Sequence, residues 1–296
     1  MDGHNHQHGE GGPEARLVTR YGGPVVVSIR TEPQNPRPLS AFRIIYSLKD
    51  TDGRPVTPDR LVMSHERLMH LVVVSRDLSF FSHIHPSDIQ GGDYSFSDTW
   101  PAEGRYVLFN EFITVHGGTQ LERHELTLGT GADTGTVVVS LDGLRPGDTR
   151  QVDGLTVSFK SQPQKIRRRA PARFTLIISA GGRPVTTLEP YLGAPAHVVI
   201  VSTDTTQFIH THADAGQVAP AGSGNGSGAG SGAGTGTGAG SGHHHAMAMS
   251  TAQPAGFGPD ITFTHTFMQA GSYKMWVQFG HAGRVITVPC SITVLK

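Results

Sequence analysis

Cysteine is almost missing from this chain of 296 residues, which contains Cys290 alone. One cysteine cannot form an intrachain disulfide, and it cannot supply the several thiolates of a structural zinc or iron–sulfur site. Cys290 lies in the run VPCSITVL, on the same strand face as Val288 and Ile292, so we expect a small buried residue. Any metal site must therefore use histidine, methionine or carboxylate ligands.

An excess of one charge and long apolar runs are missing as well. The 24 lysines and arginines balance 24 aspartates and glutamates, which gives no global bias toward nucleic acid. No apolar run approaches the roughly 20 residues that span a bilayer. The first residues, Met1-Asp-Gly-His, lack the apolar core of a signal peptide, which fits either a cytosolic protein or one whose leader has been removed.

Sustained helical periodicity is also absent. Short runs rich in β-branched and aromatic residues follow one another instead, for example at 24–30, 41–50 and 105–115, and glycine, proline and aspartate separate them. Such a series is typical of antiparallel β-sandwiches. We therefore predict an all-β protein.

Histidine is abundant, with 17 residues, and six of them belong to a duplicated stretch. The segment HLVVVSRDLSFFSHIHP (70–86) returns as HVVIVSTDTTQFIHTHA (197–213) at a constant offset of 127 residues. The offset carries one histidine triad onto another: His70, His83 and His85 onto His197, His210 and His212. Asp77 and Asp204 match as well, and we interpret both as turn formers.

The first copy predicts an antiparallel hairpin with its three histidines at one end. Side chains alternate along a strand, so His83 and His85 share a face. If Val74 pairs with Phe81, then His70 stands opposite His85. A slip of one residue would turn His70 to the other face, so the register is a testable prediction.

The same register places His197 beside His212 in the second copy. Three neutral imidazoles suit a late first-row metal ion, and affinity usually peaks at Cu²⁺. Ordinary histidines bonded to the backbone are the alternative. Because binding needs neutral imidazole, we expect affinity to fall below about pH 6.5. The sequence leaves open whether the triads form separate sites or face each other.

The duplication extends over most of the chain. GRYVLFNEF (104–112) resembles GSYKMWVQF (271–279) at an offset of 167, so about 40 additional residues lie within the second copy. They form a Gly/Ser/Ala segment, and we expect a long flexible loop over about 216–257. We predict a tail (1–20), a first repeat (21–130) and a second repeat (131–296).

Two further groups of histidine and methionine lie in these low-complexity segments. Histidine together with a thioether suits copper in either oxidation state, and a histidine-rich tail can capture metal loosely. A solvated terminus, a plain strand entry and an engineered linker are the alternatives. The possible accessory ligands are His243, His244, His245, Met247 and Met249 in the loop, and His4, His6 and His8 in the tail.

The combined pattern resembles bacterial exported β-sandwich domains of the YtkA-like type and, more loosely, periplasmic copper-resistance proteins of the CopC type. The matching residues are His70, Asp77, Phe81, His83, His85, Pro86, Gly104, Tyr106 and Phe112, and then His197, Asp204, Phe208, His210, His212, Gly271, Tyr273 and Phe279. The second copy departs at Ala213, where the first has Pro86. The resemblance implies two tandem Ig-like sandwiches in the cell envelope and a connection with copper.

We therefore predict a periplasmic or secreted protein that captures, buffers or delivers copper, as Cu(II) and also Cu(I), with zinc as the alternative metal. An envelope metal transporter or a metalloenzyme is the expected partner. No nucleic-acid partner and no membrane span are expected.

Two other functions remain open at this point. One is a metal-dependent enzyme, either a copper oxidase or a zinc hydrolase, in which Glu111 supplies a carboxylate base that its counterpart Gln278 cannot. The other is an Ig-like spacer or adhesion module with incidental histidines. His116 and His281 follow matched strands, and we interpret them as exposed loop residues rather than fourth ligands.

Overall fold

The computed structural model describes residues 25–130, 137–214 and 256–296. Over these residues the chain is almost entirely β-structure, with one 3-10 turn, η1 (Pro58–Arg60), and no α-helix. No helix in these ranges is long and apolar enough to span a membrane. The predicted tail at 1–20 and nearly all of the predicted Gly/Ser-rich loop lie outside the described residues.

The first repeat forms a sandwich of two antiparallel sheets. Its strands are β1 (Val25–Glu32), β2 (Phe42–Asp50), β3 (Leu61–Val62), β4 (Met69–Ser75), β5 (Phe81–Ile84), β6 (Asp88–Gln90), β7 (Asp93–Asp98), β8 (Gly104–Thr114) and β9 (Gly118–Leu128). One sheet has the order β1-β2-β7-β6, and the other has the order β3-β8-β4-β5 with β9 paired to β8. Trp100, Tyr94 and Tyr106 fill the core between them.

The second repeat builds the same sandwich. Its strands are β10 (Thr149–Val152), β11 (Leu155–Gln162), β12 (Pro171–Ala180), β13 (Arg183–Pro184), β14 (His197–Ser202), β15 (Phe208–His212), β16 (Asp260–Thr266), β17 (Gly271–His281) and β18 (Arg284–Val294). The sheet β15-β14-β17-β18 repeats the pairing β5-β4-β8-β9 of the first repeat. The prediction of two tandem antiparallel sandwiches is therefore confirmed. Cys290 is fully buried in the second core, and this burial raises the pKa of its thiol.

The predicted register of both hairpins is confirmed. In the first, Val74 pairs with Phe81 and Val72 pairs with His83. In the second, His197 pairs with His212. The register depends on the turns, since Asp77 Oδ1 accepts hydrogen bonds from the Ser75 hydroxyl (2.5 Å) and from the Ser79 amide (3.1 Å).

The turn of the second hairpin has the same construction. Asp204 Oδ1 accepts from the Ser202 hydroxyl (2.5 Å) and from the Thr206 amide (3.0 Å). The residue after each aspartate, Leu78 or Thr205, has a positive φ of 60°. Both aspartates are therefore turn formers, as predicted.

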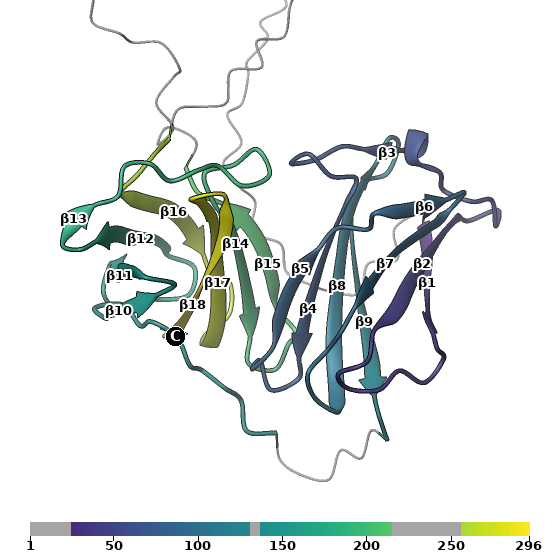
Figure 1. Cartoon of the computed structure of the whole chain (residues 1–296), viewed down its shortest axis with the longest axis horizontal. Helices are drawn as coiled ribbons and strands as arrows, with labels where there is room; N and C mark the ends of the chain where they lie inside the picture. Colours follow the sequence, from purple (N-terminus) through teal and green to yellow (C-terminus); the bar gives the residue numbers. More distant parts are fainter. Residues whose placement is uncertain (1–24, 131–136, 215–255) are drawn as a thin grey trace, which may run out of the picture.

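The two sandwiches pack on each other through the sheets that carry the hairpins (Figure 1). Every residue of β4 is buried, because Leu71 and Val73 enter the first core while Val72 and Val74 enter the junction between the repeats. An apolar run on both faces is the pattern of a strand covered on both sides.

Two aromatic stacks cross this junction, and the duplication relates them. Phe81 stacks on Trp276 with ring centroids 4.6 Å apart, and Phe109 stacks on Phe208 at 4.4 Å. The offsets of 127 and 167 residues carry Phe81 onto Phe208 and Phe109 onto Trp276. The junction is therefore a two-fold, self-complementary interface of the kind found in homodimers, built here within one chain.

Candidate metal centre

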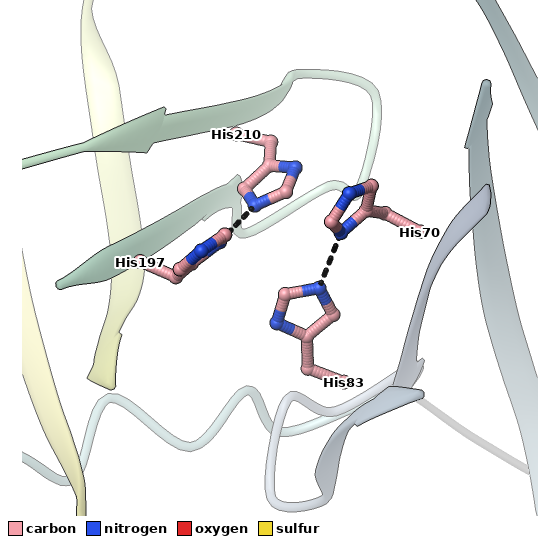
Figure 2. A group of neighbouring side chains, drawn as sticks. All are labelled: His70, His83, His197 and His210. Carbon is pink, nitrogen blue, oxygen red and sulfur yellow. Dashed lines mark hydrogen bonds between the residues drawn. The ribbon is translucent and has the colours of Figure 1, made fainter. Parts of the chain in front are cut away.

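The structure brings the two predicted triads together at one end of the junction. His70 Nδ1 lies 3.4 Å from His83 Nε2, and His197 Nδ1 lies 3.1 Å from His210 Nε2. Figure 2 shows these two pairs facing each other from opposite repeats. The ring centroids of His83 and His210 are 5.1 Å apart. The six histidines therefore form one cluster, a point that the sequence left open.

Backbone carbonyls fix the tautomers of His70 and His197. The Nε2–H of His70 donates to the Ser64 carbonyl oxygen at 3.0 Å, and the Nε2–H of His197 donates to the Leu192 carbonyl oxygen at 3.4 Å. A carbonyl oxygen only accepts, so each ring must carry its proton on Nε2. Nδ1 of both rings consequently presents a lone pair to the centre of the cluster.

Side chains from the opposite repeat fix the other two tautomers. The Nδ1–H of His83 donates to Gln278 Oε1 at 2.8 Å, and the Nδ1–H of His210 donates to Glu111 Oε2 at 2.9 Å. The amide of Gln278 is oriented by its own Nε2–H, which donates to the Thr287 hydroxyl at 3.1 Å. Both Nε2 atoms are therefore left as lone pairs that point inward.

Four lone pairs thus converge where a cation fits. One ring nitrogen from each of His70, His83, His197 and His210 lies within 4.8 Å of the others. Bonds of 2.0–2.1 Å in a tetrahedral site place neighbouring nitrogens about 3.3 Å apart. The separations of 3.4 and 3.1 Å within each pair match this value. Facing lone pairs repel, so a bound cation relieves a repulsion that the tautomers impose.

Burial keeps these rings neutral. His70 is 5% exposed and His197 is fully buried. Desolvation lowers the pKa of His83 to about 4, and burial with the facing rings lowers the pKa of His210 well below its usual value. These imidazoles therefore stay neutral below the pH of about 6.5 at which an unperturbed imidazole takes up a proton.

His85 and His212 flank the four central rings. His85 Nε2 lies 3.2 Å from His70 Nδ1, and burial lowers the pKa of His85 to about 2. The His212 ring centroid lies 4.4 Å from that of His197, and burial lowers its pKa to about 2 as well. Both predicted residues belong to the cluster but lie outside the central group of four.

His65, to which no sequence pattern assigns a role, joins the cluster from the loop before β4. Its ring stacks on His212 with centroids 3.6 Å apart, and it forms a second ligand group with His197 and His212. One potential donor atom from each lies within 4.8 Å of the others. No local pattern marks this residue, because the other two members of its ligand group, His197 and His212, belong to the other repeat.

A cavity of about 330 Å³ opens beside the cluster. Its polar wall contains Glu111 and four histidines, and its apolar wall includes Phe112, Leu121 and Phe208. The histidines that line it are His65, His70, His210 and His212. The cavity connects both ligand groups with the surroundings.

The remaining predicted or unassigned histidines lie elsewhere. His116 is exposed, as predicted, whereas His281 at the end of β17 is half-buried with an unpartnered Nδ1. His265 is buried and its ring packs against Phe267. The possible accessory ligands at 243–249 and 4–8 lie outside the described residues.

The chain belongs to the family described as "Domain of unknown function (DUF8832)", whose model matches residues 27–128, 150–231 and 234–296. No curated protein matches. Among solved structures, the Escherichia coli adhesin FdeC is 12% identical with a TM-score of 0.25, over 91% of this chain and 64% of its own. The Yersinia pseudotuberculosis adhesin InvE is 8% identical with a TM-score of 0.25, over 91% and 60%.

Salmonella alpha-2-macroglobulin is 9% identical with a TM-score of 0.28, over 93% of this chain and 17% of its own. This chain therefore spans less than two thirds of FdeC, InvE and the macroglobulin. At such TM-scores these likenesses carry no argument about function.

Proposed function

We propose that this protein binds a late first-row metal ion, copper in the first place, between its two sandwiches. The observation that carries the proposal is the convergence of four imidazole nitrogens within 4.8 Å, with the other nitrogen of each ring hydrogen-bonded to an acceptor. Such outer partners orient metal-binding histidines and set their tautomers.

Copper is preferred to zinc on the chemistry of the ligands. All central donors are imidazoles, which suit several late metals, and affinity for a given site peaks at Cu²⁺. The sequence at 243–249 also contains methionines beside histidines, and thioethers select Cu(I). Zinc, with four tetrahedral imidazoles, is the competing ion.

The role we propose is capture, buffering or delivery of copper in the periplasm or outside the cell. The histidine-rich stretches of the sequence at 4–8 and 243–249 would raise the local concentration of ion available to the cluster. An envelope metal transporter or a metalloenzyme is the proposed recipient. The similarity of the motif to exported YtkA-like and CopC-type domains supports this location.

A spacer or adhesion module is the second candidate. In that case the histidines only hold the sandwiches together through hydrogen bonds across the junction. Stoichiometric metal binding separates the two candidates, since a spacer needs no ion.

The test is a titration of the full chain with Cu(II) and Zn(II) at pH 7.5, with bound metal counted by elemental analysis. In the reference chain the accessory residues at 4–8 and 243–249 are replaced by alanine or serine, so that only the cluster binds tightly. His83→Gln removes a central ligand, and His265→Gln is the matched control, because His265 is a buried histidine outside the cluster.

The proposal predicts tight copper binding that His83→Gln reduces and His265→Gln leaves unchanged. Bound metal should also raise the melting temperature of the reference chain in a concentration-dependent way, because it binds only the folded state. A reference chain without stoichiometric binding would contradict the proposal and favour the spacer. Tight binding of zinc with weak binding of copper would show that zinc, and not copper, is the ion of this site.

A further inference from the structure

We propose that the cluster holds a second metal ion at His65, His197 and His212, beside the ion of the central four histidines. His197 bridges the two ions as an imidazolate: Nδ1 binds the central ion, while Nε2 releases its proton to solvent and binds the second ion instead of donating to the Leu192 carbonyl oxygen. This inference rests on the proposed function. Each of the three residues places a potential donor atom within 4.8 Å of the other two. Nε2 of His212 is buried without a hydrogen-bond partner. Such an atom is costly to bury unless it meets a proton donor or a metal ion.

One ion cannot use all the donors of the cluster. A late first-row ion in an imidazole site takes about four protein ligands, whereas seven rings meet here. The rings of His65 and His212 stack with centroids 3.6 Å apart, and neither ring belongs to the central group. His65 and His212, together with the shared His197, are called the flank below. They bind an ion of their own and add no ligands to the central site.

The flank has no counterpart on the other side of the cluster. The offset of 127 residues carries His65 onto Leu192, and both residues have a left-handed backbone, with φ of 46° and 50°. The same loop thus presents imidazole in the first repeat and an aliphatic side chain in the second. The flank that is related by the duplication, His70 with His85, lacks its third imidazole. Two ions are therefore expected, not three.

The second ion would lie beside the cavity. His65 and His212 line this cavity of about 330 Å³, as do His70 and His210 of the central four. Three protein ligands leave a coordination position free, as in open metal sites. The flank is therefore the position at which an ion enters, leaves or takes an external ligand, and the central four histidines are the retentive position.

The experiment counts copper in the full chain with its accessory histidines and methionines replaced, before and after His65→Ala. His65 lies in a loop outside both cores, so its loss leaves the fold intact, as circular dichroism would check. His116→Ala is the matched control, because His116 is an exposed loop histidine outside both ligand groups. Electron paramagnetic resonance of the Cu(II) form is the second readout.

The proposal predicts two equivalents in the reference chain and in His116→Ala, and one in His65→Ala. Two copper ions that share His197 should give a coupled resonance, and His65→Ala should replace it by the signal of one isolated ion. A reference chain with one equivalent that His65→Ala does not change would overturn the second site and leave the proposed function standing. No tight equivalent in any chain would overturn both.

Discussion

The two repeats contribute the same three histidines to the cluster but surround them differently. Glu111 of the first repeat bonds His210 of the second, while Gln278, its counterpart, bonds His83 of the first. A carboxylate makes the imidazole that it holds a stronger donor, and an amide does so less. His65 faces the cluster where the second repeat has Leu192. The duplication therefore supplies a symmetric frame, and single substitutions within it make the two halves of the centre unequal.

The shared histidine should show the largest effect. We expect His197→Ala to abolish tight binding of both ions, because His197 belongs to both ligand groups. His85→Ala, which removes a histidine from neither group, should retain both. Elemental analysis of the copper-loaded chains measures the difference. Equal losses of bound copper in His197→Ala and His85→Ala would mean that the two histidine triads act as independent sites.

Loss of a stack across the junction should destabilise the whole chain. Trp276 is 4% exposed and packs on Phe81, so Trp276→Ala should lower the free energy of unfolding by about 3–5 kcal/mol. Leu39→Ala, at a residue 77% exposed, should change it by less than about 0.5 kcal/mol. Urea denaturation measures both. A change at Trp276 as small as that at Leu39 would show that the two sandwiches do not depend on this contact.

The next substitution tests Glu111, the carboxylate that the first repeat has where the second has Gln278. Glu111→Gln makes the two outer partners alike and should weaken copper binding by about 10–100-fold, through the weaker donor at His210. Gln278→Glu, the reciprocal change, should not weaken it. Competition with a chelator of known affinity gives both values. Unchanged copper affinity in Glu111→Gln would show that the difference between Glu111 and Gln278 does not affect metal binding.

Acid should destabilise the metal-free fold. Burial lowers the pKa of His83 to about 4, whereas an unfolded histidine titrates near 6.5. The unfolded chain therefore binds more protons in this window, and stability falls as pH drops from about 6.5 toward 4, by at most about 1.4 kcal/mol per unit for one such ring. Thermal unfolding between pH 7 and 4.5 measures the slope.

His83→Gln removes this ring and should make the slope smaller. His265 also has its pKa lowered to about 4 by burial, so His265→Gln supplies a reference slope from outside the cluster. A slope that neither substitution alters would place the acid sensitivity in other groups.

Much of the fold and half of the site follow from local sequence. Period-two alternation fixed the hairpin register, and that register placed His70, His83 and His85 at one end of one face. The continuous run HLVVVS also indicates a strand covered on both faces, since Val72 and Val74 are as apolar as Leu71 and Val73. This run indicates burial of both faces, but it does not indicate which element covers the second face.

The remainder of the site depends on packing between elements far apart in sequence. Which surface of one sandwich meets the other is set by shape and apolar area, as at Phe109 and Phe208, and not by any spacing. The asymmetry of Glu111 and Gln278 was visible in the sequence, but their bonds to the opposite repeat were not. His65 carries no local signal, because His212 lies in the other repeat.

The central claim is that the two repeats share one metal centre. The most direct test is anomalous diffraction at the copper edge from crystals of the copper-loaded full chain. We predict a peak within about 2.0–2.1 Å of ring nitrogens from both repeats, His70 and His83 on one side and His197 and His210 on the other. Separate peaks, each bound by histidines of one repeat only, or no peak at the cluster, would contradict the account.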